Sequence, residues 1–200
     1  LHEFGHVAAA KHYGIHTPDI TLLPIGGVAR LERMPREPFQ EFVVAICGPL
    51  VNAVIAALIS IVLHQSPGME TPVDFVGGSI WQSLMKWNLI MIAFNMIPAF
   101  PMDGGRVLRA LLAMMMDYGK ATRLAASIGQ GIAVLGFMGA LLWIHSPWLL
   151  VIAIFIFMSA GQEAAMVTEE ETSRGLVVSN AMVTDFHTLD PDATLREAVA

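Results

Sequence analysis

The sequence is poor in cysteine and in charge. Cys47 is the only cysteine among 200 residues, and one cysteine cannot form a disulfide within the chain, so a disulfide-stabilised scaffold is excluded. Charged residues make up 14% of the chain, against roughly 25% in soluble domains. The 11 Lys and Arg residues are outnumbered by 17 Asp and Glu residues, which excludes a nucleic-acid-binding protein with a basic surface. The 55% share of hydrophobic residues also excludes a disordered chain and indicates a membrane protein.

Long stretches of the chain contain no charged residue. The first runs from 42 to 69 and the second from 124 to 162. The second is too long for one membrane span of about 20 residues, and we expect it to divide at Pro147 because proline ends a helix. A further span is expected between about 80 and 102, and residues 1–16 look like the end of another helix. We therefore predict an all-α polytopic membrane protein, a transmembrane helix bundle.

The positive residues cluster in segments that would lie on one side of the membrane. The loop between about 64 and 79, on the opposite side, contains no Lys or Arg. Lys86 is the exception, and it lies near a helix end where it can snorkel. Because cytoplasmic loops are enriched in Lys and Arg, we expect a multi-pass protein of the cell membrane with a cytoplasmic C-terminal tail. The clustered residues are Lys11, Arg30, Arg33, Arg36, Arg106, Arg109, Lys120, Arg123, Arg174 and Arg196.

The first residues of the chain form an H-E-x-x-H pattern. His2 and His6 are four residues apart, so both side chains lie on one face of a helix and can reach one metal ion. Glu3 then lies beside the metal as a general base for a water molecule. The alternative is a pair of histidines hydrogen-bonded in a helix core. Ionisable residues in an apolar helix are costly in lipid and usually functional, which favours the metal site.

A catalytic zinc site needs a third protein ligand, with the fourth position left for water. Asp103 is the candidate, because a carboxylate at the end of an apolar span needs a partner. Pro98, Pro101 and the two glycines after Asp103 would interrupt a regular helix there, and irregular backbone at membrane depth is tolerated where it is buried or lines a wet cavity. The alternative is that Asp103 merely starts a cytoplasmic loop and caps the next helix.

The two motifs together resemble the site-2 protease family of intramembrane zinc metalloproteases. They are H-E-F-G-H at residues 2–6 and N-M-I-P-A-F-P-M-D-G-G-R at residues 95–106. The family usually has Leu before the Asp-Gly, where this chain has Met102, a volume-conserving change. The likeness runs from residue 1 to about 162 and lacks the family's first helix, so we interpret the chain as a fragment. By this resemblance one zinc ion per chain is bound by His2, His6 and Asp103, and Glu3 is the catalytic base.

Two further segments resemble parts of the same family. Gly48-Pro49-Leu50-Val51-Asn52 looks like the family's G-P-x-x-N and is expected to open the second helix, where small residues allow close helix approach. Asn52 either forms a hydrogen bond near the site or an ordinary interhelical one, and Asn95 has the same two interpretations. Residues 22–30 contain two extended pieces around Gly26-Gly27, which predicts a small β-hairpin insertion.

The resemblance implies that this hairpin dips toward the site. An extended substrate could then pair with the hairpin edge by strand addition. A purely structural hairpin is the alternative.

The composition becomes polar after Gln162. We expect residues 1–162 to form the metalloprotease core, 163–177 a polar linker and 178–200 the truncated start of a cytoplasmic α/β CBS domain, which the tail resembles. Within the family, complete paired CBS domains imply regulation by adenine nucleotides. The alternative is an unrelated polar tail.

The family resemblance implies a zinc metalloendopeptidase that cleaves transmembrane segments of membrane protein substrates in the lipid bilayer. The first alternative is a membrane metal transporter or sensor, which would also place His and Asp in apolar helices. That alternative gives no reason for Glu3 between the histidines. The second alternative is a catalytically inactive regulatory homologue, although all four expected site residues are present.

Overall fold

The computed structural model describes residues 1–15, 19–23, 26–30, 35, 37–64, 79–173 and 182. Helices dominate this part of the chain, with one pair of short strands between the first two helices. The elements are α1 (His2–His12), β1 (Asp19–Leu23), β2 (Gly26–Arg30), α2 (Pro38–His64), α3 (Ile80–Asn95), α4 (Asp103–Ala113), α5 (Tyr118–Gly139), the π-helical turn η1 (Ala140–Ile144) and α6 (Pro147–Ser173).

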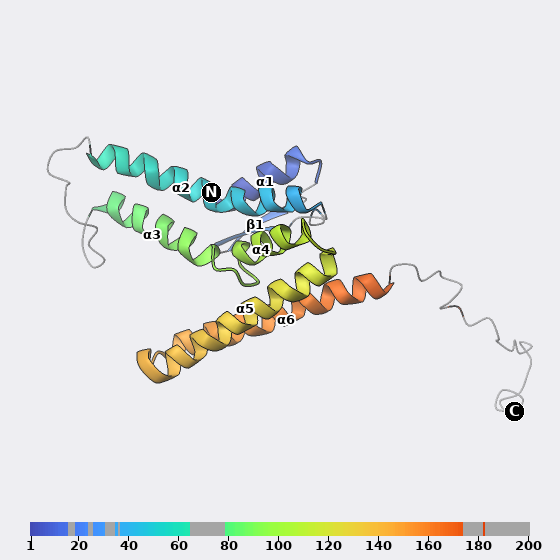
Figure 1. Ribbon diagram of the computed structural model, residues 1–200. Coiled ribbons are helices and arrows are strands. Elements are labelled where there is room, and N and C mark those ends of the chain that lie inside the picture. The colour runs from blue at the N-terminus through green and yellow to red at the C-terminus, as the bar shows by residue number, and fades with distance from the viewer. Residues whose placement is uncertain are drawn as a thin grey trace, which may run out of the picture.

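The helices form two long hairpins that diverge from a common base. Figure 1 shows α2 beside α3 and α5 beside α6, with the short helices α1 and α4 where the two hairpins approach each other. Helix α1 packs on α2, and α4 packs on both α2 and α5. The base of the two hairpins is therefore the place where residues distant in sequence meet.

Three helices are long and apolar enough to cross a membrane: Pro38–Leu63, Tyr118–Ile144 and Pro147–Thr172. This agrees with the predicted polytopic helical architecture, and the expected break before Pro147 is confirmed. The third expected span, 80–102, is wrong in length, because α3 ends at Asn95. Pro98 explains the early end, since a proline disfavours the helical conformation of the residue before it.

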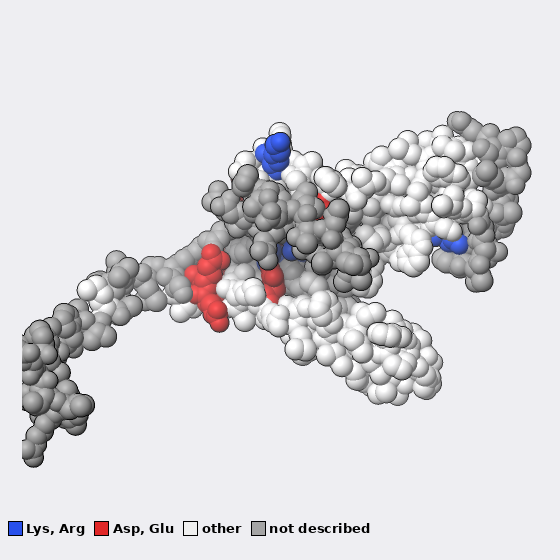
Figure 2. Space-filling view, turned by 180° about the vertical axis from the view of Figure 1, so that it is seen from behind, with Lys and Arg blue, Asp and Glu red and all other residues white. Residues whose placement is uncertain are grey.

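The surface of the two hairpins is apolar. Figure 2 shows most of the coloured charged residues near the middle of the molecule, while the described surface of the two arms is white apart from one blue patch on the α2–α3 arm. Large hydrophobic side chains are exposed along the arms, among them Leu58 of α2, Leu135 of α5 and Phe155 of α6. Such continuous apolar surface would be unfavourable in water, and it fits contact with lipid.

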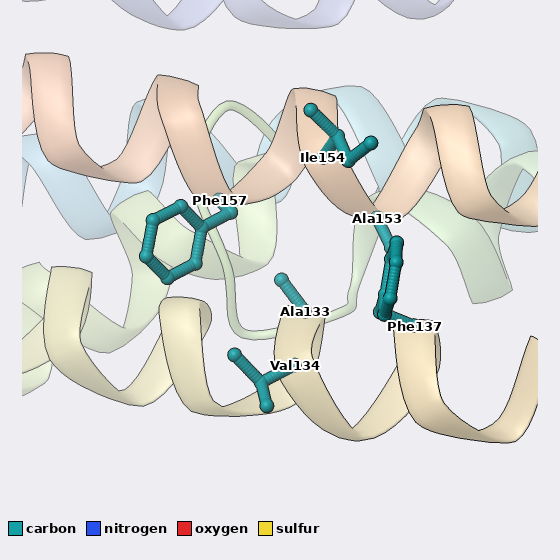
Figure 3. A pocket seen from close by; sticks show the side chains of 6 residues that line it. All are labelled: Ala133, Val134, Phe137, Ala153, Ile154 and Phe157. Atoms are coloured by element: carbon teal, nitrogen blue, oxygen red, sulfur yellow. The ribbon is translucent and has the colours of Figure 1, made fainter. Parts of the chain in front are cut away.

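A small cavity of about 150 Å³ lies between α5 and α6. Figure 3 shows the side chains that line it, Ala133, Val134 and Phe137 from α5 and Ala153, Ile154 and Phe157 from α6. The small alanines leave space that the neighbouring aromatic rings do not fill. All six lining residues are apolar, so this cavity offers no group for chemistry.

The two strands pair in antiparallel register and lie against α1 through β2. Gly26 pairs with Leu23 and Gly27 pairs with Leu22. The expectation that the two glycines form the turn is therefore wrong, because they are the first two residues of β2.

Two other expected boundaries also differ. Helix α2 already begins at Pro38, so Gly48 and Pro49 lie inside the helix and do not open it. Helix α6 continues to Ser173, so residues 163–173 of the expected linker are helical. Ala, Glu and Met are good helix formers, and polarity alone did not end the helix. The predicted CBS start at 178–200 lies outside the described residues, apart from Met182.

Candidate metal centre

The two motif histidines lie on the buried face of α1. His2 and His6 are 8% and 6% exposed. Gly5 lies on the same face, and a Cβ atom there would come within 2.4 Å of the Cys47 carbonyl oxygen. The absence of a side chain at Gly5 therefore allows α1 to approach α2 closely. This approach places both imidazoles against α2.

The third predicted ligand is the first residue of α4. Met102 occupies the N-cap position, and Asp103 is buried. Its carboxylate turns toward α1, and Asp103 Oδ2 lies 3.0 Å from His2 Nε2. Asp103 thus starts a helix, as the alternative interpretation required, but its side chain contacts the histidines.

The two glycines after Asp103 explain how the preceding loop folds over the start of α4. A Cβ atom on Gly104 would lie 2.3 Å from the Ile97 carbonyl oxygen, and one on Gly105 would lie 2.7 Å from the Ala99 carbonyl carbon. Any larger residue would push this loop away. The D-G-G sequence is therefore required by the close backbone approach that brings Asp103 inward.

The three candidate ligand atoms have the spacing that a tetrahedral metal ion requires. His2 Nε2 lies 3.1 Å from His6 Nε2, and Asp103 Oδ2 lies 3.0 Å from His2 Nε2 and 3.4 Å from His6 Nε2. Tetrahedral zinc with ligands at 2.0–2.1 Å has ligand atoms about 3.3 Å apart. Elsewhere in the described chain, no other group of three His, Cys, Asp or Glu residues comes together in this way.

Helix α2 orients both imidazole rings from behind. His6 Nδ1 donates a hydrogen bond of 2.8 Å to the Val44 carbonyl oxygen, so Nε2 of the neutral ring carries a lone pair that faces the other two ligand atoms. The Asn52 amide lies 3.2 Å from His2 Nδ1. An amide turned with its oxygen toward Nδ1–H would leave His2 Nε2 unprotonated as well. Asn52 is thus brought to the site, as one of its two interpretations predicted.

Gly48 makes the space that the imidazoles occupy. A Cβ atom at this position would lie 2.1 Å from His6 Nε2 and 2.8 Å from His2 Nε2. From the sequence we expected only close helix approach at Gly48, and its place behind the ligand atoms was missed. The signal that could have found it is the four-residue spacing of Val44, Gly48 and Asn52, which puts all three on one face of α2.

Burial and charge act against each other at Asp103. Burial disfavours the ionised carboxyl, but the hydrogen bonds and positive charge of His2 and His6 outweigh it and hold the pKa of Asp103 below its ordinary value. The carboxyl is therefore ionised at neutral pH. A bound metal ion would take the place of the imidazole protons, because two neutral imidazole lone pairs and a carboxylate would then face one cation instead of repelling one another. The donor set fits a divalent metal ion.

The remaining predicted site residues differ in how they are placed relative to the three candidate ligands. Glu3 follows His2 on α1 and is half-buried, so its carboxyl is not enclosed by helix packing. Asn95 is the last residue of α3 and forms no hydrogen bond with His2, His6 or Asp103. Gly26 and Gly27 belong to β2, which lies against α1, the helix that carries both histidines.

Comparison with known proteins finds relatives over almost the whole chain. A zinc metalloprotease of Methanocaldococcus jannaschii is 36% identical over 197 residues, covering 98% of this chain and 56% of that protein. A putative zinc metalloprotease of Synechocystis is 32% identical, covering 98% of this chain and 52% of that protein. This chain thus spans about half the length of these relatives.

A solved structure and a family model agree with these relatives. The structure of a site-2 protease from Methanocaldococcus jannaschii matches with a TM-score of 0.62 and 35% identity, covering 95% of this chain and 76% of that one. The sequence model of peptidase family M50 matches residues 1–78 and 74–138. The ranges of the family-model match include His2, His6 and Asp103. The chain therefore belongs to peptidase family M50.

Proposed function

We propose that this chain is the core of a zinc-dependent protease that cleaves peptide bonds within transmembrane segments of membrane proteins. The observation that carries the proposal is the convergence of His2 Nε2, His6 Nε2 and Asp103 Oδ2 within 3.4 Å of one another. This cluster lies in a member of a peptidase family whose long helices fit a bilayer. The zinc metalloprotease names of its relatives support the choice of zinc.

In this proposal His2, His6 and Asp103 hold one zinc ion per chain. Bound zinc supplies a Lewis acid for the scissile carbonyl and makes water nucleophilic at neutral pH. The Glu3 carboxylate accepts the proton of the attacking water and delivers it to the leaving amine nitrogen. Its half-buried position beside His2 leaves it accessible to water and substrate. Asn52 contacts His2 Nδ1, the ring nitrogen other than the ligand atom Nε2, and so holds the ring in place.

The substrate is a transmembrane helix that must unwind locally, because a helix shields its carbonyls from attack. We propose that the unwound segment pairs with the edge of the β1–β2 hairpin by strand addition. The contact of β2 with α1 supports this role, because it places the hairpin, with Gly26 and Gly27 in β2, beside the helix that carries His2 and His6. Asn95, half-buried with no hydrogen bond to the ligands, has an amide free to contact the unwound segment.

We also propose the wider organisation of the protein. The core comprises residues 1–162, and 163–177 connect it to a CBS domain that starts at 178–200. The clustering of Lys and Arg at one membrane side supports a cytoplasmic tail. Adenine nucleotides bound by complete CBS domains would regulate cleavage from that side.

The experiment that tests this function compares the full-length wild type with Glu3→Gln and Asp103→Ala in detergent. Each is assayed for bound zinc and for cleavage of a model transmembrane substrate in proteoliposomes. We expect one zinc per wild-type chain, loss of zinc in Asp103→Ala, and normal zinc but a loss of cleavage of roughly 100-fold or more in Glu3→Gln. Wild-type cleavage by zinc-loaded Glu3→Gln would refute the assignment of Glu3. A zinc-loaded wild type that cleaves nothing would favour an inactive homologue.

A further inference from the structure

A second cluster of buried charge lies close to the metal centre. Arg109 of α4 and Glu41 of α2 are each only 1% exposed. Arg109 donates from Nε and Nη2 to the same oxygen, Glu41 Oε1, over 2.8 and 2.5 Å. Its Nη1 atom donates to Glu163 Oε1 of α6 over 2.5 Å. One guanidinium therefore joins three helices.

The guanidinium is also held between two aromatic rings. Its Cζ atom lies 5.0 Å from the centre of the Phe100 ring and 5.1 Å from the centre of the Tyr118 ring. Cation–π contacts of this kind add to the ion pairs when the charge is removed from water. The planar fork and the two rings restrict both the position and the rotation of Arg109.

The helices joined by the Arg109–Glu41 pair are the two that complete the metal centre. On α2, Glu41 precedes Val44, Gly48 and Asn52 by three, seven and eleven residues. These spacings put all four residues on one face of the helix. On α4, Asp103 lies six residues before Arg109, about 9 Å along the helix axis. The same α4 thus carries a candidate ligand at one end and the ion-pair anchor near the other.

A buried ion pair is weak evidence for a gain in stability, because removing two charges from water is costly. It does restrict how two helices can slide or rotate, since one partner without the other leaves an uncompensated buried charge. Metal ligands need this restriction, because errors of about 0.5 Å already impair a site. A pair that joins α4 to α2 supplies it about 9 Å along α4 from Asp103, the residue that must meet the two histidines.

We propose that Arg109 and Glu41 are positioning residues that set the affinity of the metal centre by fixing α4 against α2. Neither residue touches the metal, and both act through the placement of Asp103. This inference rests on the proposed function of the centre as a zinc site. The ion pair of Arg109 with Glu163 differs, because α2 carries Val44 and Asn52, which contact the imidazoles, while Glu163 lies on α6 and its side chain is 34% exposed. Glu163 is therefore the matched control.

The test measures zinc affinity of the full-length protein in detergent by competition with a chromophoric chelator. The variants are Glu41→Gln and Glu163→Gln, which each neutralise one carboxylate that pairs with Arg109. The thermal midpoint of each zinc-free variant is measured in parallel. We expect Glu41→Gln to weaken zinc binding by about tenfold or more, as substitutions behind metal ligands do, and Glu163→Gln to weaken it less than about twofold. A merely structural role would lower the midpoint of Glu41→Gln while leaving its zinc affinity unchanged, and that result would overturn the proposal.

A second variant that keeps the negative charge allows the test to be made even if Glu41→Gln does not fold. Glu41→Asp retains the ion pair but shortens its reach by one methylene, so it should fold and bind zinc with intermediate affinity. Equal affinity in Glu41→Asp and the wild type would count against positioning. Wild type and Asp103→Ala separate this result from the proposed function. If the wild type binds no zinc, the proposed zinc site is wrong. If Asp103→Ala loses zinc but the Glu41 variants bind it as tightly as the wild type, only the positioning role is wrong.

Discussion

The molecule contains two buried polar clusters, and both depend on α4. In the first, the positive charge of Arg109 lies between two carboxylates, those of Glu41 and Glu163. In the second, His2, His6 and Asp103 direct two ring nitrogens and a carboxylate oxygen at a common point.

The difference teaches how to separate structural from ligand-binding polar groups in an apolar protein. A buried cluster in which donors face acceptors of opposite charge holds together without a further ion. A cluster whose acceptors face one another is complete only when something positive lies between them. Variants that break the Arg109 cluster should therefore lower stability even without metal, in addition to the effect on zinc affinity proposed above. Variants in the histidine cluster should affect metal binding above all.

The largest expected effect comes from filling the space behind the ligands with Gly48→Ala. The added methyl group would displace the two imidazole rings, so zinc affinity should fall by roughly 100-fold or more. The zinc-free protein should still fold, because the displaced atoms are the free ends of side chains. Zinc titration and the thermal midpoint of the zinc-free form measure the two effects. Unchanged zinc binding would show that the ligand atoms lie elsewhere.

The matched control for Gly48→Ala is Gly131→Ala on α5. A Cβ atom there meets no other described atom within 4 Å. Since alanine favours helix over glycine by up to about 1 kcal/mol, this variant should be as stable as the wild type or slightly more stable. Its zinc affinity should equal that of the wild type.

The next largest effect should come from Arg109→Ala, which removes the cation that pairs with Glu41 and Glu163. Loss of one partner leaves Glu41 buried without its counter-charge, so the free energy of unfolding should fall by about 3–5 kcal/mol even without zinc. Arg123→Ala removes an exposed pair with Glu171 and should cost at most about 1 kcal/mol. Denaturation of the zinc-free proteins in detergent measures both. Similar losses in the two variants would mean that burial does not distinguish these pairs.

A smaller and more selective effect is expected from Asn52→Ala. The His2 ring would lose the amide that orients it, so zinc affinity should fall by about tenfold, with little change in the stability of the zinc-free form. The chelator competition assay used for Gly48→Ala measures it. An unaltered affinity would favour the other interpretation of Asn52, an ordinary interhelical hydrogen bond.

Much of the helical architecture and the candidate site could be predicted from the sequence, because local spacing encodes them. The four-residue spacing of His2 and His6 predicts one shared helix face, and the structure has both on the buried face of α1. The break before Pro147 follows from the chemistry of proline. Asp103 was a candidate because a carboxylate at the end of an apolar span needs a partner, but only the family resemblance paired it with the histidines, because it lies 101 residues from His2. The assignment of these residues as zinc ligands stays a prediction.

The errors and omissions have physical causes. The end of α6 was missed because a change in polarity marks where apolar surface stops, and helix propensity continues through the alanines and glutamates beyond it. The Arg109–Glu41 pair was missed because its partners lie 68 residues apart and each alone resembles an ordinary charged residue. The role of Gly48 depends on side chains that arrive from another helix, which composition does not reveal.

Helix α4 fixes both the distance and the angle between Asp103 and Arg109. This limits which insertions and deletions the chain can accept. One residue inserted between them would rotate one end by about 100° and shift it by about 1.5 Å relative to the other. Either the carboxylate or the guanidinium would then point away from its partners. Substitutions within this segment are compatible with both clusters, but a change in its length is not. Among related chains, the number of residues between these two positions should therefore stay constant even where their identities drift.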